Sequence, residues 1–83
     1  MTRVVIVDDH AMFRSGVRSE LLAQPGGPID VVGEGEDVDT AVAAIREHRP
    51  DVVLLDVHLP GGGGVEVMRQ CASAETRFLA LSV

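Results

Sequence analysis

VVIVDD at residues 4–9 and VVLLD at residues 52–56 are the stretches that decide the fold of this sequence. Each contains a short apolar run without polar alternation, which is typical of a strand buried on both faces of a parallel sheet. Each run also ends in carboxylates, Asp8 and Asp9 in the first and Asp56 in the second. We therefore expect two central strands whose carboxyl ends carry acidic side chains.

Helix and strand patterns alternate on either side of these runs. Asp37 precedes the second helix as a cap, and Pro50 prevents that helix from continuing. Further strands are expected from Ile29 to about Gly35 and from Phe78 to Leu81. The apolar positions predict three helices at helical spacing: Phe13, Val17 and Leu21 with Met12 and Leu22; Val38, Ala41, Val42 and Ile45; and Val65, Met68 and Ala72.

The resulting order βαβαβαβ predicts an α/β fold with a parallel sheet and helices on both faces. Open sheets of this kind bind ligands outside the carboxyl ends of their strands. Asp8, Asp9, Asp56 and Ser82 all fall at such ends. We expect them to surround one site.

Composition excludes several functions. A net charge of −6 in 83 residues, with no lysine, opposes direct binding of nucleic acid, which depends on cationic side chains. Cys71 is the only cysteine, so a disulfide within the chain is impossible, and we expect it to serve packing. The apolar run at residues 4–7 is too short for a signal peptide or a membrane span, which predicts a cytoplasmic protein without membrane contact.

Three carboxylates in one pocket would repel one another unless a cation compensates, and oxygen ligands with open water positions suit Mg²⁺. Such a cation would also allow an anionic carboxylate to attack an anionic phosphoryl group. Asp56 is then the expected nucleophile, forming an acyl phosphate, while Asp8 and Asp9 position the cation.

The whole chain from Arg3 to Val83 resembles a response-regulator receiver domain. The matching segments are residues 5–10, residues 50–61 and residues 79–82. Asp-Asp-His at residues 8–10, followed by Phe-Arg-Ser-Gly-Val at residues 13–17, resembles the NarL/FixJ (LuxR-type) subfamily. The resemblance implies a flavodoxin-like, doubly wound sheet with strand order 2-1-3-4.

The resemblance also implies roles for individual residues. Asp56 is the phosphoacceptor, Asp8 and Asp9 are the acidic pair that holds Mg²⁺ with Asp56, and His58 is a metal ligand through its backbone carbonyl. Ser82 is the switch hydroxyl. The implied function is a non-enzymatic module that takes a phosphoryl group from a sensor histidine kinase and switches a transcriptional output.

The sequence departs from the family in lacking the lysine that follows a fifth strand. It also stops one residue beyond Ser82, so we expect residues 1–83 to be the N-terminal portion of a receiver domain without its final helix, strand and helix. The DNA-binding output domain, the only expected contact with DNA, would lie outside this chain. An unpaired fourth strand predicts a homodimer or a domain-swapped dimer.

Rival functions are a receiver-like interaction module that works without phosphorylation and, less favoured, a phosphatase of the haloacid-dehalogenase type. Such phosphatases carry a second Asp two residues after the nucleophile, where this sequence has His58.

No Gly-Lys-Ser/Thr follows Gly61–Gly64, which excludes a P-loop. The glycine run either tunes the phosphoryl lifetime or reflects sequence drift, and drift is preferred. His10, His48 and His58 lie apart in the expected topology, so we do not expect a transition-metal site.

Overall fold

The fold is a parallel sheet covered by helices on both faces, as the alternating pattern predicts. The computed structural model describes residues 1–23, 28–59 and 63–81. Its elements follow the order βαβαβαβ. They are β1 (Thr2–Val7), α1 (Ala11–Leu22), β2 (Ile29–Gly35), α2 (Val38–His48), β3 (Val52–Asp56), α3 (Gly63–Cys71) and β4 (Arg77–Leu81).

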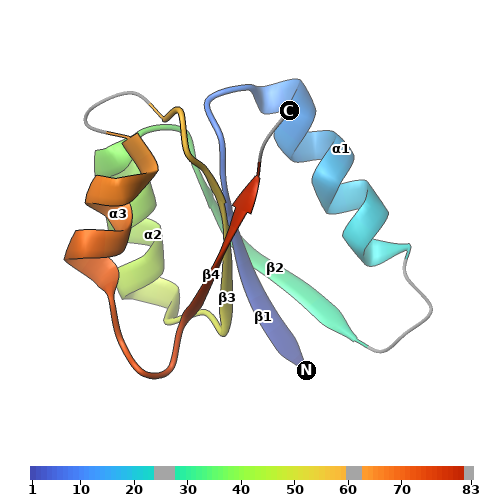
Figure 1. Cartoon of the computed structure of the whole chain (residues 1–83). Coiled ribbons are helices and arrows are strands. Elements are labelled where there is room, and N and C mark those ends of the chain that lie inside the picture. The colour runs from blue at the N-terminus through green and yellow to red at the C-terminus, as the bar shows by residue number, and fades with distance from the viewer. Residues whose placement is uncertain (24–27, 60–62, 82–83) are drawn as a thin grey trace.

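The four strands are parallel and lie in the order β2-β1-β3-β4, which confirms the predicted order. Helix α1 covers one face of the sheet, and α2 and α3 lie side by side on the other (Figure 1). The switch in strand order falls between β1 and β3, because β2 lies on one side of β1 and β3 on the other. Sites in such sheets lie beyond the carboxyl ends of the strands on either side of that switch.

Alternate residues of the central strands point to opposite faces, so the continuous apolar runs supply two cores. On the face of α1, Val4 and Ile6 form a small cluster with Val31. On the face of α2 and α3, Val5 and Val7 join a larger cluster. The other buried members of that larger cluster are Val38, Ala41, Val42, Ile45, Val53, Leu55, Leu59 and Val67.

Helix α2 matches its prediction in both boundaries and packing. Asp37 accepts a hydrogen bond from the Thr40 backbone N–H at 2.8 Å, and the Thr40 hydroxyl accepts one from the Asp37 backbone N–H at 3.1 Å. These reciprocal bonds form a capping box, which satisfies N–H groups that a helix start otherwise leaves unpaired. After the helix, Arg49 adopts a left-handed conformation, with φ of 47°, ahead of the buried Pro50.

Helix α1 contacts the sheet less closely than its apolar stripe predicts. Val17 and Leu21 are half-buried against the cluster on that face. Met12 is 89% exposed and Leu22 is also exposed, and no residue of α1 is fully buried. The helix is instead tied to β2 through ion pairs from Arg14 and Arg18 to Glu34.

The predicted buried stripe of α3 was wrong. Val65 is 74% exposed and Met68 is exposed, whereas Gly64 and Val67 are buried and Cys71 packs beside them. A Cβ atom on Gly64 would lie 3.0 Å from the Asp56 carbonyl oxygen and 3.2 Å from Leu55 Cγ. The helix therefore approaches β3 through a residue without a side chain, which a search for apolar side chains does not find.

Of the glycines at residues 61–64, the structure describes Gly63 and Gly64. The backbone geometry at both positions favours glycine, which contradicts the preferred explanation of sequence drift. Gly63 has a φ of 75°, a left-handed conformation that residues with a Cβ adopt at a cost. Gly64 permits the close approach to β3. Gly61 and the residue after it lie outside the described residues.

Burial raises the pKa of the Cys71 thiol, which fits its predicted packing role.

Candidate functional site

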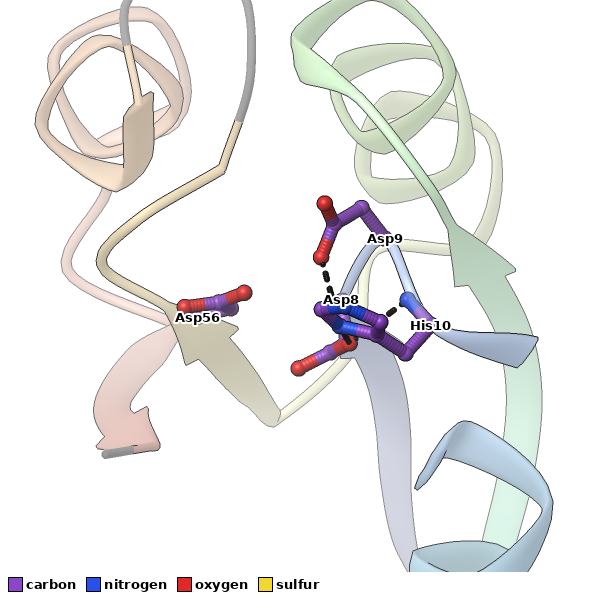
Figure 2. Close-up of side chains that lie close together, drawn as sticks. All are labelled: Asp8, Asp9, His10 and Asp56. Atoms are coloured by element: carbon purple, nitrogen blue, oxygen red, sulfur yellow. Dashed lines mark hydrogen bonds and ion pairs between the residues drawn. The ribbon is translucent and has the colours of Figure 1, made fainter. Parts of the chain in front are cut away.

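The carboxyl ends of β1 and β3 bring the three predicted acids together. Val7 pairs with Leu55 in the parallel register, so the residues that follow them, Asp8 and Asp56, leave the sheet side by side. Asp9 follows directly in the loop before α1. One oxygen from each of these carboxylates and one nitrogen of His10 all lie within 4.8 Å of one another. Figure 2 shows Asp56 facing the other three side chains from the end of β3.

Asp8 lies deepest in this group. It is 3% exposed, and among the residues that the structure describes it is the one buried charged residue. Its carboxylate accepts a hydrogen bond from the His10 backbone N–H at 2.7 Å, and its own N–H donates to the Gly35 carbonyl at 3.0 Å. The guanidinium of Arg14 donates a hydrogen bond to the backbone carbonyl of Asp8. Asp8 is therefore held rigidly by β2 and α1.

Asp56 is the last residue of β3 and is half-buried. Its Oδ1 accepts a hydrogen bond from the backbone N–H of His58 at 2.9 Å. This bond is made within the turn that directly follows β3, and it orients the Asp56 carboxylate. A pocket of about 470 Å³ opens around it, lined by Asp8, Asp9, His10, Phe13, Asp56 and His58.

The structure therefore unites Asp8, Asp9 and Asp56, and it places His58 in the lining of the same pocket. Ser82, the predicted switch hydroxyl, lies outside the described residues. His10 precedes α1 as its capping residue, but its side chain makes no capping hydrogen bond. Its ring turns to the carboxylates instead, a contact that was not predicted from the sequence although His10 directly follows both acids.

The donor set fits a divalent cation. The buried carboxylate of Asp8 has two further carboxylates as neighbours, and three negative charges so close need a compensating charge. The His10 ring is the one potentially cationic side chain in the group, and it is 74% exposed. Carboxylate oxygens in an open, hydrated pocket are the ligands that Mg²⁺ prefers.

No helix within the described residues combines the length and apolarity that a membrane span requires.

Comparison with known proteins agrees with this geometry. The family model for the response regulator receiver domain matches residues 4–83. The chain is 44% identical over 82 residues to the probable transcriptional regulatory protein NarL of Mycobacterium tuberculosis, covering 96% of this chain and 37% of that protein. It is 37% identical over 83 residues to the transcriptional regulatory protein DegU of Brevibacillus brevis, covering 98% and 34%. The chain thus spans about a third of the length of these relatives.

Solved structures give the same result. The signal receiver domain of the putative response regulator NarL from M. tuberculosis superposes with a TM-score of 0.77 at 42% identity, covering 95% of this chain and 64% of that one. A LuxR-family two-component response regulator from Aurantimonas sp. superposes with a TM-score of 0.79 at 32% identity, covering 100% and 61%. The predicted likeness to the NarL/FixJ subfamily is confirmed.

Proposed function

This chain belongs to the response regulator receiver domain family, and from that premise we propose that it accepts a phosphoryl group on Asp56 with the help of Mg²⁺. One observation carries the proposal. The Asp56 carboxylate shares a solvent-open pocket with the carboxylates of Asp8 and Asp9, all within 4.8 Å. Among the described residues, no second group of three or more acidic, histidine or cysteine side chains lies this close together.

In the proposed reaction an Asp56 carboxylate oxygen attacks the phosphorus of the donor. The new bond joins that oxygen to phosphorus, and the bond from phosphorus to the donor's leaving group breaks. The proposed donor is the phosphohistidine of a sensor kinase, and acetyl phosphate serves as a substitute that releases acetate. Mg²⁺, when bound by Asp8, Asp9, Asp56 and the His58 carbonyl, would neutralise charge on the transferring phosphoryl oxygens.

The chain's own residues would contribute positioning. The His58 N–H holds Asp56 Oδ1 at 2.9 Å, so one carboxylate oxygen is fixed and the orientation of the other follows from it. The backbone of Asp8 is anchored through Gly35 and Arg14, and its carboxylate accepts the His10 backbone N–H at 2.7 Å, which holds it in the pocket. Preorganised groups of this kind lower the barrier because little rearrangement is needed during the reaction.

The test is incubation with acetyl phosphate and Mg²⁺ followed by intact mass measurement. We expect a mass gain of one phosphoryl group, lost on removal of Mg²⁺ and absent in Asp56→Asn. Asp39→Asn, an exposed acid in the first turn of α2, is the matched control and should react like the parent chain. A folded parent chain that gains no mass under these conditions would favour the phosphorylation-independent interaction module.

The proposal includes a non-enzymatic, cytoplasmic role in which phosphorylation controls a transcriptional output, since NarL and DegU are named as transcriptional regulatory proteins. A phosphatase of the haloacid-dehalogenase type stays the less favoured alternative, because His58 stands two residues after Asp56. Steady turnover of a phosphomonoester by the parent chain would favour that alternative.

We also propose that the isolated 83-residue chain self-associates through β4. That strand pairs with β3 on one side and is the last in the order, and Leu79 on it is 55% exposed. An exposed strand edge offers unpaired N–H and C=O groups to another chain. Light scattering should give a mass above that of one chain, and a folded sample with the mass of one chain contradicts this proposal.

A further inference from the structure

We infer that Arg14 is a positioning residue for the cation site: its guanidinium fixes the peptide group between Asp8 and Asp9 and thereby directs the Asp9 carboxylate into the pocket. The inference rests on the proposed function for the presence of a cation beside these acids. Arg14 does not line the pocket and acts through the backbone of Asp8. Glu34 on β2 in turn orients Arg14.

Arg14 binds the backbone that links the two acids. Its Nη1 donates a hydrogen bond to the backbone carbonyl of Asp8 at 2.5 Å. That carbonyl belongs to the peptide group that joins Asp8 to Asp9. Because a peptide group is planar, fixing its carbonyl also fixes the direction of the Asp9 N–H and of the chain that leads to the Asp9 side chain. The guanidinium therefore sets how the second acid leaves the first.

Asp9 has few other anchors. Asp8 is held at its N–H by the Gly35 carbonyl and at its carboxylate by the His10 N–H. Asp9 forms no hydrogen bond with another backbone group in the described part of the chain. Its carboxylate pairs with the ring of His10, which is itself 74% exposed. The direction of this carboxylate, which Figure 2 shows beside Asp8, therefore depends on the peptide group that Arg14 holds.

The guanidinium is itself held in one orientation. Its Nε donates to Oε1 of Glu34 at 2.9 Å, and the Arg14 side chain is 15% exposed. Glu34 pairs in register with Ile6 of β1, so this ion pair joins α1 to the sheet close to the site. The other oxygen of Glu34 accepts a hydrogen bond from Nη1 of Arg18 at 2.6 Å. With both of its oxygens bound, the Glu34 carboxylate gives the planar guanidinium a fixed partner.

Helix α1 offers little else to fix the turn at residues 8–10. No residue of the helix is fully buried, and the side chain of His10 makes no capping hydrogen bond. The backbone N–H of Arg14 donates to the His10 carbonyl at 3.0 Å, in the first turn of the helix. Arg14 thus holds the turn through its backbone as well as through its side chain.

Positioning and simple electrostatics predict opposite effects when the guanidinium is removed. A positive charge near a cation site repels Mg²⁺, so loss of the Arg14 charge alone would tighten Mg²⁺ binding. Loss of positioning would weaken Mg²⁺ binding, because Asp9 must then be ordered when the cation binds. Arg14→Lys separates the two effects. It keeps the charge, but one ammonium does not reproduce the planar fork that reaches Glu34 and Asp8 together.

The test measures the Mg²⁺ affinity of the parent chain and its variants from the backbone NMR shifts of residues 8–10 and 56. Arg14→Gln and Arg14→Lys are the test variants. Arg18→Gln is the matched control, because Arg18 binds the same Glu34 carboxylate from one turn further along α1. Circular dichroism and urea unfolding establish that each variant is folded under the conditions of the titration. If Arg14→Gln does not fold, Arg14→Lys decides alone.

We expect both Arg14 variants to weaken Mg²⁺ binding by on the order of 10-fold, as is typical when a partner that orients a metal ligand is removed. Arg18→Gln should bind Mg²⁺ within about two-fold of the parent chain, because its ion pair is more exposed. A double-mutant cycle with Asp9→Asn gives a further readout. Adding Arg14→Gln to Asp9→Asn should weaken binding by less than about two-fold more, because the carboxylate that Arg14 orients is already gone.

Parent-like or tighter Mg²⁺ binding in either folded Arg14 variant overturns the inference. So does the same loss in Arg18→Gln, because the ion pair to Glu34 would then be responsible rather than the bond to Asp8. A 10-fold loss that persists in the Asp9→Asn background overturns it as well. In each of these cases Mg²⁺ binding by the parent chain leaves the proposed function standing. If the folded parent chain binds no Mg²⁺, both fail.

Discussion

Replacing Gly35 by alanine tests whether α2 packs on β2 as closely as the structure requires. A Cβ atom at this position would lie 2.6 Å from Cα of Ala41 and 2.8 Å from its backbone nitrogen. Both are backbone atoms of α2, so no side-chain rotation can relieve the overlap. The helix or the end of β2 must move. Because the Gly35 carbonyl accepts the N–H of Asp8 at 3.0 Å, that movement reaches the candidate site.

The cost can be estimated from the effect of overfilling a packed core. Inserting one carbon without room costs about 1–3 kcal/mol of the free energy of unfolding. In a domain of this size each 1 kcal/mol lowers the midpoint of thermal unfolding by about 4–8 °C, so we expect a decrease of about 4–24 °C. A domain this small has limited stability to lose.

The assay is thermal and urea unfolding followed by circular dichroism, with all variants at one protein concentration. Gly16→Ala is the matched control, since an added Cβ there has nothing within 4 Å and the residue lies exposed within α1. Alanine in a helix is about 0.5–1 kcal/mol more favourable than glycine, so this variant should be more stable than the parent chain. A midpoint for Gly35→Ala at or above that of the parent would refute the packing argument.

Val67→Ala should lower the free energy of unfolding by about 1–3 kcal/mol, because it removes two methyl groups from a fully buried position. Val65→Ala, on the exposed face of α3, should change the free energy of unfolding by less than about 0.5 kcal/mol. Urea unfolding of both variants measures the difference, and equal effects would contradict the assignment of Val67 to the buried face of α3. Hydrogen bonds from the backbone and hydroxyl of Thr40 hold the pKa of Asp37 below its ordinary value of 3.8. The capping carboxylate therefore contributes stability that is complete above pH 3.8 and is lost as the pH falls through the lower folded value. In Thr40→Val the pKa of Asp37, measured by NMR titration, should rise toward 3.8, and an unchanged pKa would show that the hydroxyl has no part in it.

Local sequence patterns suffice to predict the order of the elements and the edge of the sheet at which the acids gather. Short continuous apolar runs are typical of strands buried in the middle of a parallel sheet, and the residue that ends such a run lies at the carboxyl edge. The positions of Asp8, Asp9 and Asp56 follow from that rule alone. The same is true of α2, whose cap at Asp37 and stop before Pro50 are local signals.

Tertiary structure alone decided the faces of α1 and α3 and the part of His10. Apolar periodicity selected Val65 and Met68, but the closest approach of α3 to β3 runs through Gly64, whose lack of a side chain makes it invisible to a hydrophobic pattern. His10 follows Asp8 and Asp9 in sequence, yet only the turn into α1 points its ring back at both carboxylates. Local sequence indicates the conformation and burial that each residue prefers. The buried faces of α1 and α3 and the orientation of the His10 ring depend instead on contacts with backbone segments that are distant in sequence, and these contacts form only when the whole chain packs.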